Sequence, residues 1–90
     1  MEFHAPRKNG ITIYSKSNCK NCDILKRLLF DFETTTIICD TYLENDKEAF
    51  KSFMFHHMGF IPADMKICFP LVFYKGRYLK SYKSILDYIE

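Results

Sequence analysis

The sequence lacks the features that mark several common classes of protein. No apolar run approaches the ~20 residues of a membrane-spanning helix, so we expect no membrane contact. Met1–Lys8 has no apolar core of the kind found in signal peptides, which makes the cytoplasm the expected compartment. The 13 lysines and arginines are interspersed with 11 acidic residues, and this scatter predicts no nucleic-acid partner.

Repeats and low-complexity segments are also missing, and the length of 90 residues is that of one domain. The hydrophobic share of 48% is sufficient for a core at this size. We therefore expect one domain over residues 1–90 and a monomer. Residues 1–10 are expected to form a polar lead-in that ends in a turn at Asn9-Gly10.

The four cysteines are the most informative residues that are present: Cys19, Cys22, Cys39 and Cys68. In a reducing compartment, cysteines serve catalysis or metal binding more often than structural disulfides. Cys19 and Cys22 form a C-x-x-C pair between a β-rich run, Ile11–Ser15, and a helix-like run. A C-x-x-C pair at that junction is typical of thiol–disulfide exchange enzymes.

The spacing of apolar residues predicts an α/β fold with the order β-α-β-α-β-β-α. Strands are expected at residues 11–15, 37–39, 70–74 and 77–80. Helices are expected over 19–32, from a capping box at 45–48 to Gly59, and from Ser81 onward. The first β-α-β unit predicts parallel strands, and the turn at Lys75-Gly76 predicts an antiparallel hairpin. The result is a mixed four-stranded sheet with helices on both faces.

The position of the cysteine pair assigns a role to each sulfur. A helix N-terminus or a nearby cation lowers the pKa of a thiol, and the thiolate is the nucleophile. Cys19 is expected at the helix start between Lys16 and Lys20, with Cys22 one turn deeper. We therefore expect Cys19 to attack a substrate disulfide and Cys22 to resolve the mixed disulfide. Tyr14 is expected to pack near the pair.

Two other interpretations of the pair stay open. A C-x-x-C zinc site normally needs a second ligand pair at matched spacing. The other candidate ligands, Cys39, Cys68 and His56-His57, have no such pattern, so no metal site is predicted. A metal or iron–sulfur module that uses Cys19 is one alternative, and a redox-silent interaction module is the other. We expect Cys39 to be buried. Cys68 is expected to be a buried cysteine at the end of a strand, with a third thiol beside the pair as the alternative.

Phe69-Pro70 leads into a predicted strand. Proline suits the first residue of a strand because it has no N–H for the sheet ladder. A cis peptide bond costs little before proline. A cis bond here would leave the backbone of Phe69 free to pair with a substrate strand beside Cys19.

These segments together resemble the glutaredoxins. The similarity rests on Tyr14-Ser15-Lys16, the Cys19–Cys22 motif, Phe69–Phe73 and the turn at Gly76, and it extends in element order over nearly all of residues 11–90. The small form found in phages and large viruses is the most similar. The resemblance implies a thioredoxin-like fold and a thiol–disulfide oxidoreductase that acts on protein disulfides or glutathione mixed disulfides. It also implies glutathione as reductant and no tightly bound cofactor.

The resemblance also assigns individual residues. Cys19 is similar to the family's nucleophile and Cys22 to its resolving thiol. Lys16 is similar to the lysine that binds the glycine carboxylate of glutathione, and Pro70 to the cis-proline. The residues implied in substrate or glutathione binding are Lys16, Tyr14, Phe69, Pro70, Tyr82 and Lys83.

The chain departs from the family pattern around the glutathione site. Lys20-Asn21 replaces the common Pro-Tyr between the cysteines, and Cys68 replaces a common threonine. Lys80-Ser81 replaces a glycine pair, and neither Lys83 nor Ser84 supplies the acid that pairs with the ammonium of glutathione. These departures predict a weaker dependence on glutathione than is usual in the family.

Overall fold

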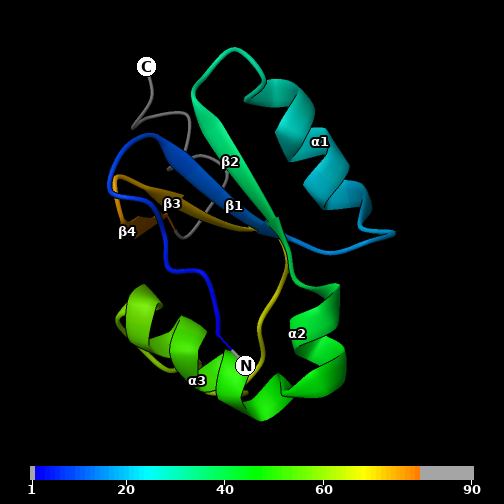
Figure 1. The fold of residues 1–90 in the computed structure, drawn as a ribbon, viewed down its shortest axis with the longest axis vertical. Helices are drawn as coiled ribbons and strands as arrows, with labels where there is room; N and C mark the ends of the chain where they lie inside the picture. The colour runs from blue at the N-terminus through cyan, green and yellow to red at the C-terminus, as the bar shows by residue number, and fades with distance from the viewer. Residues whose placement is uncertain (1, 80–90) are drawn as a thin grey trace.

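The computed structural model describes residues 2–79, which form a mixed four-stranded β-sheet with helices on both faces (Figure 1). The strand order is β2-β1-β3-β4. The elements in chain order are β1 (Ile11–Ser15), α1 (Lys20–Leu28), β2 (Thr34–Ile38), α2 (Asp40–Asn45), α3 (Lys47–Met58), β3 (Leu71–Tyr74) and β4 (Arg77–Leu79). The parallel β1–β2 pair and the antiparallel β3–β4 hairpin are both confirmed. The helix predicted from Ser81 lies outside the described residues.

Successive residues of the strands contribute to two hydrophobic clusters, one on each face of the sheet. Ile11 and Ile13 pack toward α1, against its Leu25 and against Leu29, which directly follows the helix. Tyr14 packs on the other face, among side chains of α3 and β3. This alternation follows from the two-residue period of a strand. All five residues of β1 are buried, so packing on both faces holds the strand in place and fixes where the following loop begins.

Helix α1 is shorter than the predicted range of 19–32. It ends at Leu28, where the Leu29 N–H donates to the Leu25 carbonyl, and the chain then turns toward β2. The turn is needed because Thr34 must lie opposite Ile11 in the parallel ladder. Leu25 and Leu29 are buried as the spacing predicts, but Leu28 is 47% exposed. Of the apolar face expected from residues 25, 28, 29 and 32, only Leu25 and Leu29 are therefore buried.

The second strand and the helix after it also differ from the prediction. β2 spans Thr34–Ile38, so Cys39 lies beyond its end, at the start of the unpredicted helix α2. The predicted capping box is wrong, because Asn45 is the last residue of α2 and Asp46 precedes α3 without a side-chain cap. With only Tyr42 and Leu43 on its apolar side, α2 is too short for a periodic signal. The end of α3 at Gly59 is confirmed, with φ at +88°.

The segment before β1 contacts the core as well as leading into it. Phe3 packs edge-on against Tyr42 and Phe50, with ring centroids 5.0 and 5.5 Å apart. The His4 carbonyl accepts a hydrogen bond from the Tyr14 hydroxyl at 2.6 Å. Figure 1 shows this segment descending from β1 toward α3. Within residues 2–79, no helix is long and apolar enough to cross a membrane.

Candidate active site

Cys19 and Cys22 form a disulfide at the N-terminus of α1, with their Cα atoms 5.2 Å apart. Cys19 is the N-cap residue, and its Sγ accepts the backbone N–H of Cys22 at 3.2 Å. Cys19 keeps 9% of its surface exposed, whereas Cys22 has none. An incoming thiolate or disulfide therefore reaches the pair through the sulfur of Cys19.

The loop Lys16–Asn18 joins β1 to this disulfide and lies beside the start of β3. The antiparallel pairing of β1 with β3 ends at Tyr14 opposite Leu71, which brings the residues just beyond it together. The Lys16 ammonium lies 5.8 Å from the centroid of the Phe69 ring. The Phe69–Pro70 peptide bond is cis, as the resemblance to the glutaredoxins implies. Lys16, Phe69 and Pro70 thus gather at the edge of the sheet from which the cysteine loop leaves.

Asp40 is a residue of this region that sequence reasoning missed. Its Oδ1 accepts the backbone N–H of Ser17 at 2.9 Å. Hydrogen bonds from Ser17, together with the charge of Lys16, hold the pKa of Asp40 below its usual range. The position of Asp40 could have been predicted from the sequence, because parallel strands end at the same edge of a sheet and the residues that follow them lie close together. Asp40 comes just after β2, as Ser17 comes just after β1.

Tyr14 does not contribute its side chain to a binding surface. It is fully buried between the sheet and α3, and its hydroxyl donates to the His4 carbonyl. Burial raises the pKa of Tyr14 far above its ordinary value. The expectation that Tyr14 binds a ligand is therefore corrected, since the side chain is a core residue behind the active-site loop. Tyr82 and Lys83, the other two predicted binding residues, lie outside the described residues.

The two remaining cysteines have opposite environments. Cys39 is fully buried, as predicted, and burial raises its pKa to about 12. Cys68 is exposed, so the prediction that it is buried is wrong. The reason is that β3 begins only at Leu71, which leaves Cys68 in the irregular connection from α3.

This difference predicts a thiol count for the oxidised protein. With Cys19 and Cys22 joined, a thiol reagent such as Ellman's reagent should titrate one group per chain under native conditions, Cys68. Cys39 should react only after unfolding, because it is buried and its thiol stays protonated at neutral pH. A Cys68→Ser variant should show no fast-reacting group. Rapid reaction of two thiols in the folded, oxidised protein would contradict this assignment.

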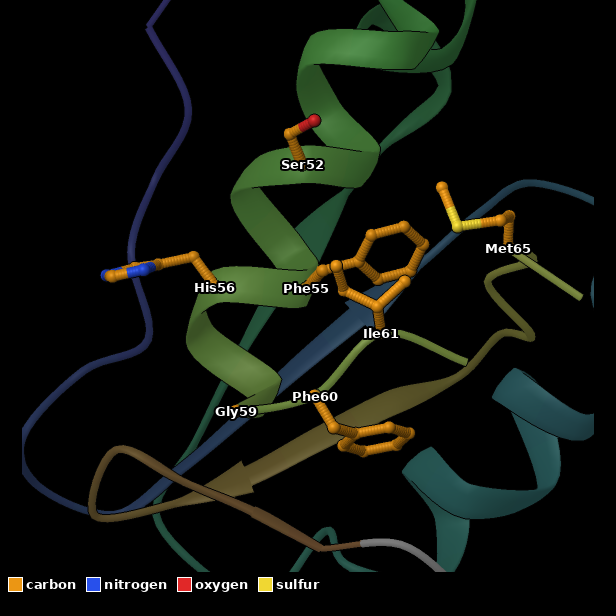
Figure 2. Close-up of a pocket in the computed structure, with 7 residues that line it drawn as sticks. All are labelled: Ser52, Phe55, His56, Gly59, Phe60, Ile61 and Met65. Carbon is orange, nitrogen blue, oxygen red and sulfur yellow. The ribbon is translucent and has the colours of Figure 1, made fainter. Parts of the chain in front are cut away.

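A separate hollow of about 480 Å³ lies between the C-terminal end of α3 and the loop after it. Figure 2 shows Phe55, Ile61 and Met65 directed into this region, while the side chain of His56, which also lines the hollow, extends from the other side of the helix. The lining is largely apolar and includes no thiol. Within the described part of the chain, no three His, Cys, Asp or Glu side chains gather as metal ligands. The disulfide region is therefore the candidate active site.

Comparison with known proteins agrees with this architecture. No family model matches the chain, and no curated protein matches it in sequence. Among solved structures, it is similar to the holo form of glutaredoxin C1 from Populus tremula x tremuloides. The TM-score is 0.62 at 20% identity, over 88% of this chain and 72% of the plant chain. The likeness shows that the chain has the thioredoxin-like fold of a glutaredoxin.

Proposed function

We propose that the protein is a glutaredoxin-like thiol–disulfide oxidoreductase that works by a dithiol mechanism. The observation that carries the proposal is the Cys19–Cys22 disulfide at the start of α1, with one sulfur partly exposed and the other buried. A structural disulfide has no need for such asymmetry, whereas exchange needs one accessible attacker and one sheltered resolver. The fold shared with a glutaredoxin supports the same conclusion.

The catalytic cycle begins with the reduced pair. The Cys19 thiolate attacks one sulfur of a substrate disulfide, breaks its S–S bond and releases the first substrate thiol. The Cys22 thiolate then attacks the Cys19 sulfur of the mixed disulfide and releases the second thiol. The helix N-terminus stabilises the negative charge on Cys19, since the free N–H groups and the helix dipole point toward it. The Cys22 N–H that reaches the Cys19 sulfur is one of these donors.

Glutathione is proposed as the reductant and glutathione mixed disulfides as one substrate class. Lys16 would pair with a carboxylate, and the backbone of Phe69, which lies before β3, would pair with an extended substrate. The backbone N–H groups of Tyr82 and Lys83 are proposed for the other carboxylate. The assignment to the small glutaredoxins of phages and large viruses stays a prediction, as does the cytoplasmic location.

A metal or iron–sulfur module that uses Cys19 is the second candidate, and the similar plant glutaredoxin is described as a holo form. The ligands of this chain do not fit a site within one subunit. Cys22 is fully buried, and residues 2–79 contain no group of three potential ligands. Metal analysis and the visible absorbance of protein purified without oxygen distinguish this candidate from a dithiol enzyme.

The proposed function is tested by oxidation and turnover of the wild-type protein. Reduced protein mixed with bis(2-hydroxyethyl) disulfide should lose two thiols per chain, and mass spectrometry should place the new disulfide at Cys19–Cys22. Turnover should then be compared with glutathione plus glutathione reductase and with thioredoxin reductase, each supplied with NADPH. Glutathione should support the faster turnover. A pair that forms no disulfide at an accessible potential would overturn the proposal and leave an interaction module.

A further inference from the structure

Asp40 brings a negative charge to the loop that carries the reactive sulfur. Its carboxylate is bonded to the Ser17 N–H at 2.9 Å, and Ser17 is two residues before Cys19. Two residues of chain span at most ~7 Å, so the backbone position that Asp40 contacts lies within that span of the Cys19 backbone. Asp40 is only half-buried, and its field therefore reaches a ligand that approaches through solvent.

The same carboxylate is a neighbour of Lys16. The Lys16 charge contributes to the lowered pKa of Asp40, and its ammonium lies over the Phe69 ring at 5.8 Å. Lys16 alone would attract a substrate carboxylate to this edge of the sheet. A fixed negative charge beside it offsets that attraction. The other charged side chains flanking the cysteine pair in the chain are Lys20 and Asp23, which are exposed and of opposite sign.

We propose that Asp40 is a specificity residue that disfavours disulfides bearing carboxylates near the sulfur and favours neutral or cationic ones. The inference rests on the proposed thiol–disulfide exchange and defines its substrate class. Disulfides of proteins in neutral or basic surroundings fit the site better than small dicarboxylate disulfides. The effect is electrostatic, because the charge acts on the approach of the substrate and not on the sulfur chemistry alone.

Three small disulfides with two methylene groups between each sulfur and its terminal group test this inference: 3,3′-dithiodipropionate, bis(2-hydroxyethyl) disulfide and cystamine. They are anionic, neutral and cationic at pH 7. Each oxidises the reduced Cys19–Cys22 pair to a disulfide and leaves as two thiols, which take the two protons of the pair. The second-order rate constant of this single oxidation is measured by stopped flow. No glutathione or reductase is needed, so the reductant does not enter the result.

In Asp40→Asn, we expect the anionic-to-neutral rate ratio to rise about two- to fourfold at low salt. The cationic-to-neutral ratio should fall by a similar factor. Asparagine keeps an oxygen for the Ser17 N–H, so the loop contact is retained. Dividing by the neutral rate removes any change in the nucleophilicity of Cys19, since that change affects all three substrates alike. Both shifts should vanish near 1 M salt, where the Debye length is about 3 Å.

Asp31→Asn is the matched control, because Asp31 is an exposed acid in the turn before β2, at the opposite end of that strand from Asp40. Its ratios should equal those of the wild type. Unchanged ratios in Asp40→Asn, or the same shift in Asp31→Asn, would overturn the inference while the proposed function stands. An equal decrease in the rate constants for all three substrates would also overturn it, and would show that Asp40 only stabilises the loop through its contact with Ser17. Failure of every substrate to oxidise the wild type would instead overturn the proposed function itself.

Discussion

Replacing Cys19 with serine is expected to lower the rate of disulfide reduction by at least about a thousandfold. A serine hydroxyl stays protonated at neutral pH and does not form the covalent intermediate with a substrate sulfur. The buried Cys22 cannot substitute for it, because none of its surface is exposed. The measurement is turnover with bis(2-hydroxyethyl) disulfide under a coupled reductase assay.

The Cys22→Ser variant should give a different result. Cys19 still attacks the substrate, but nothing within the chain resolves the mixed disulfide, which should accumulate as a mass increase of one substrate half. Cys68→Ser is the control, since this exposed thiol lies outside the pair and its loss should leave turnover unchanged. Substantial activity in Cys19→Ser, or loss of activity in Cys68→Ser, would remove the assignment of the nucleophile.

Replacing Phe50 with alanine is expected to destabilise the protein by about 3–5 kcal/mol. The Phe50 side chain is fully buried on the α3 face of the sheet and contacts the rings of both Phe3 and Tyr42. Its loss leaves a cavity that these rings cannot fill. In a domain of this size, 1 kcal/mol corresponds to about 4–8 °C in melting temperature. The midpoint should therefore fall by more than about 10 °C in a thermal scan.

Two further phenylalanines serve as comparisons for that variant. Phe3→Ala should lower the midpoint by a smaller amount, because the Phe3 ring is only half-buried in the same cluster. Phe30→Ala should change it little, since Phe30 is 75% exposed in the turn after α1. Equal midpoints for Phe3→Ala and the wild type would show that the segment before β1 adds nothing to the core.

Features that depend on residues close together in the chain could be predicted from the sequence, whereas features that depend on contacts between distant residues were missed. The C-x-x-C pair, the parallel β1–β2 pair and the antiparallel β3–β4 hairpin follow from local motifs and connection lengths, and all three agree with the structure. The cis bond before Pro70 is implied by the resemblance to the glutaredoxins, and the structure contains it. Asp40 required knowledge of which strand ends meet, because its partner Ser17 is 23 positions away. Tyr14 could be placed on the core face only once its register with β3 was known.

The errors at Cys39 and α2 have one physical cause. Three threonines begin β2, and their polarity made the strand look as though it began later, at Ile37. As an edge strand, β2 tolerates polar and exposed residues that a central strand would not. Because β2 begins and ends earlier in the chain than predicted, Cys39 and Asp40 lie after the strand, at the start of α2. This difference of a few residues decides that Asp40 lies at the edge of the sheet where the loop to Cys19 begins.

Cys19 occupies a position where helices usually have serine, threonine, aspartate or asparagine, and its sulfur accepts the same kind of backbone hydrogen bond. Serine is a stronger acceptor of that bond than a thiol. The Cys19→Ser variant should therefore keep the start of α1 and fold as well as the reduced wild type, in which the Cys19–Cys22 disulfide is also absent. An inactive but intact protein of this kind offers a direct way to hold a substrate in place without consuming it.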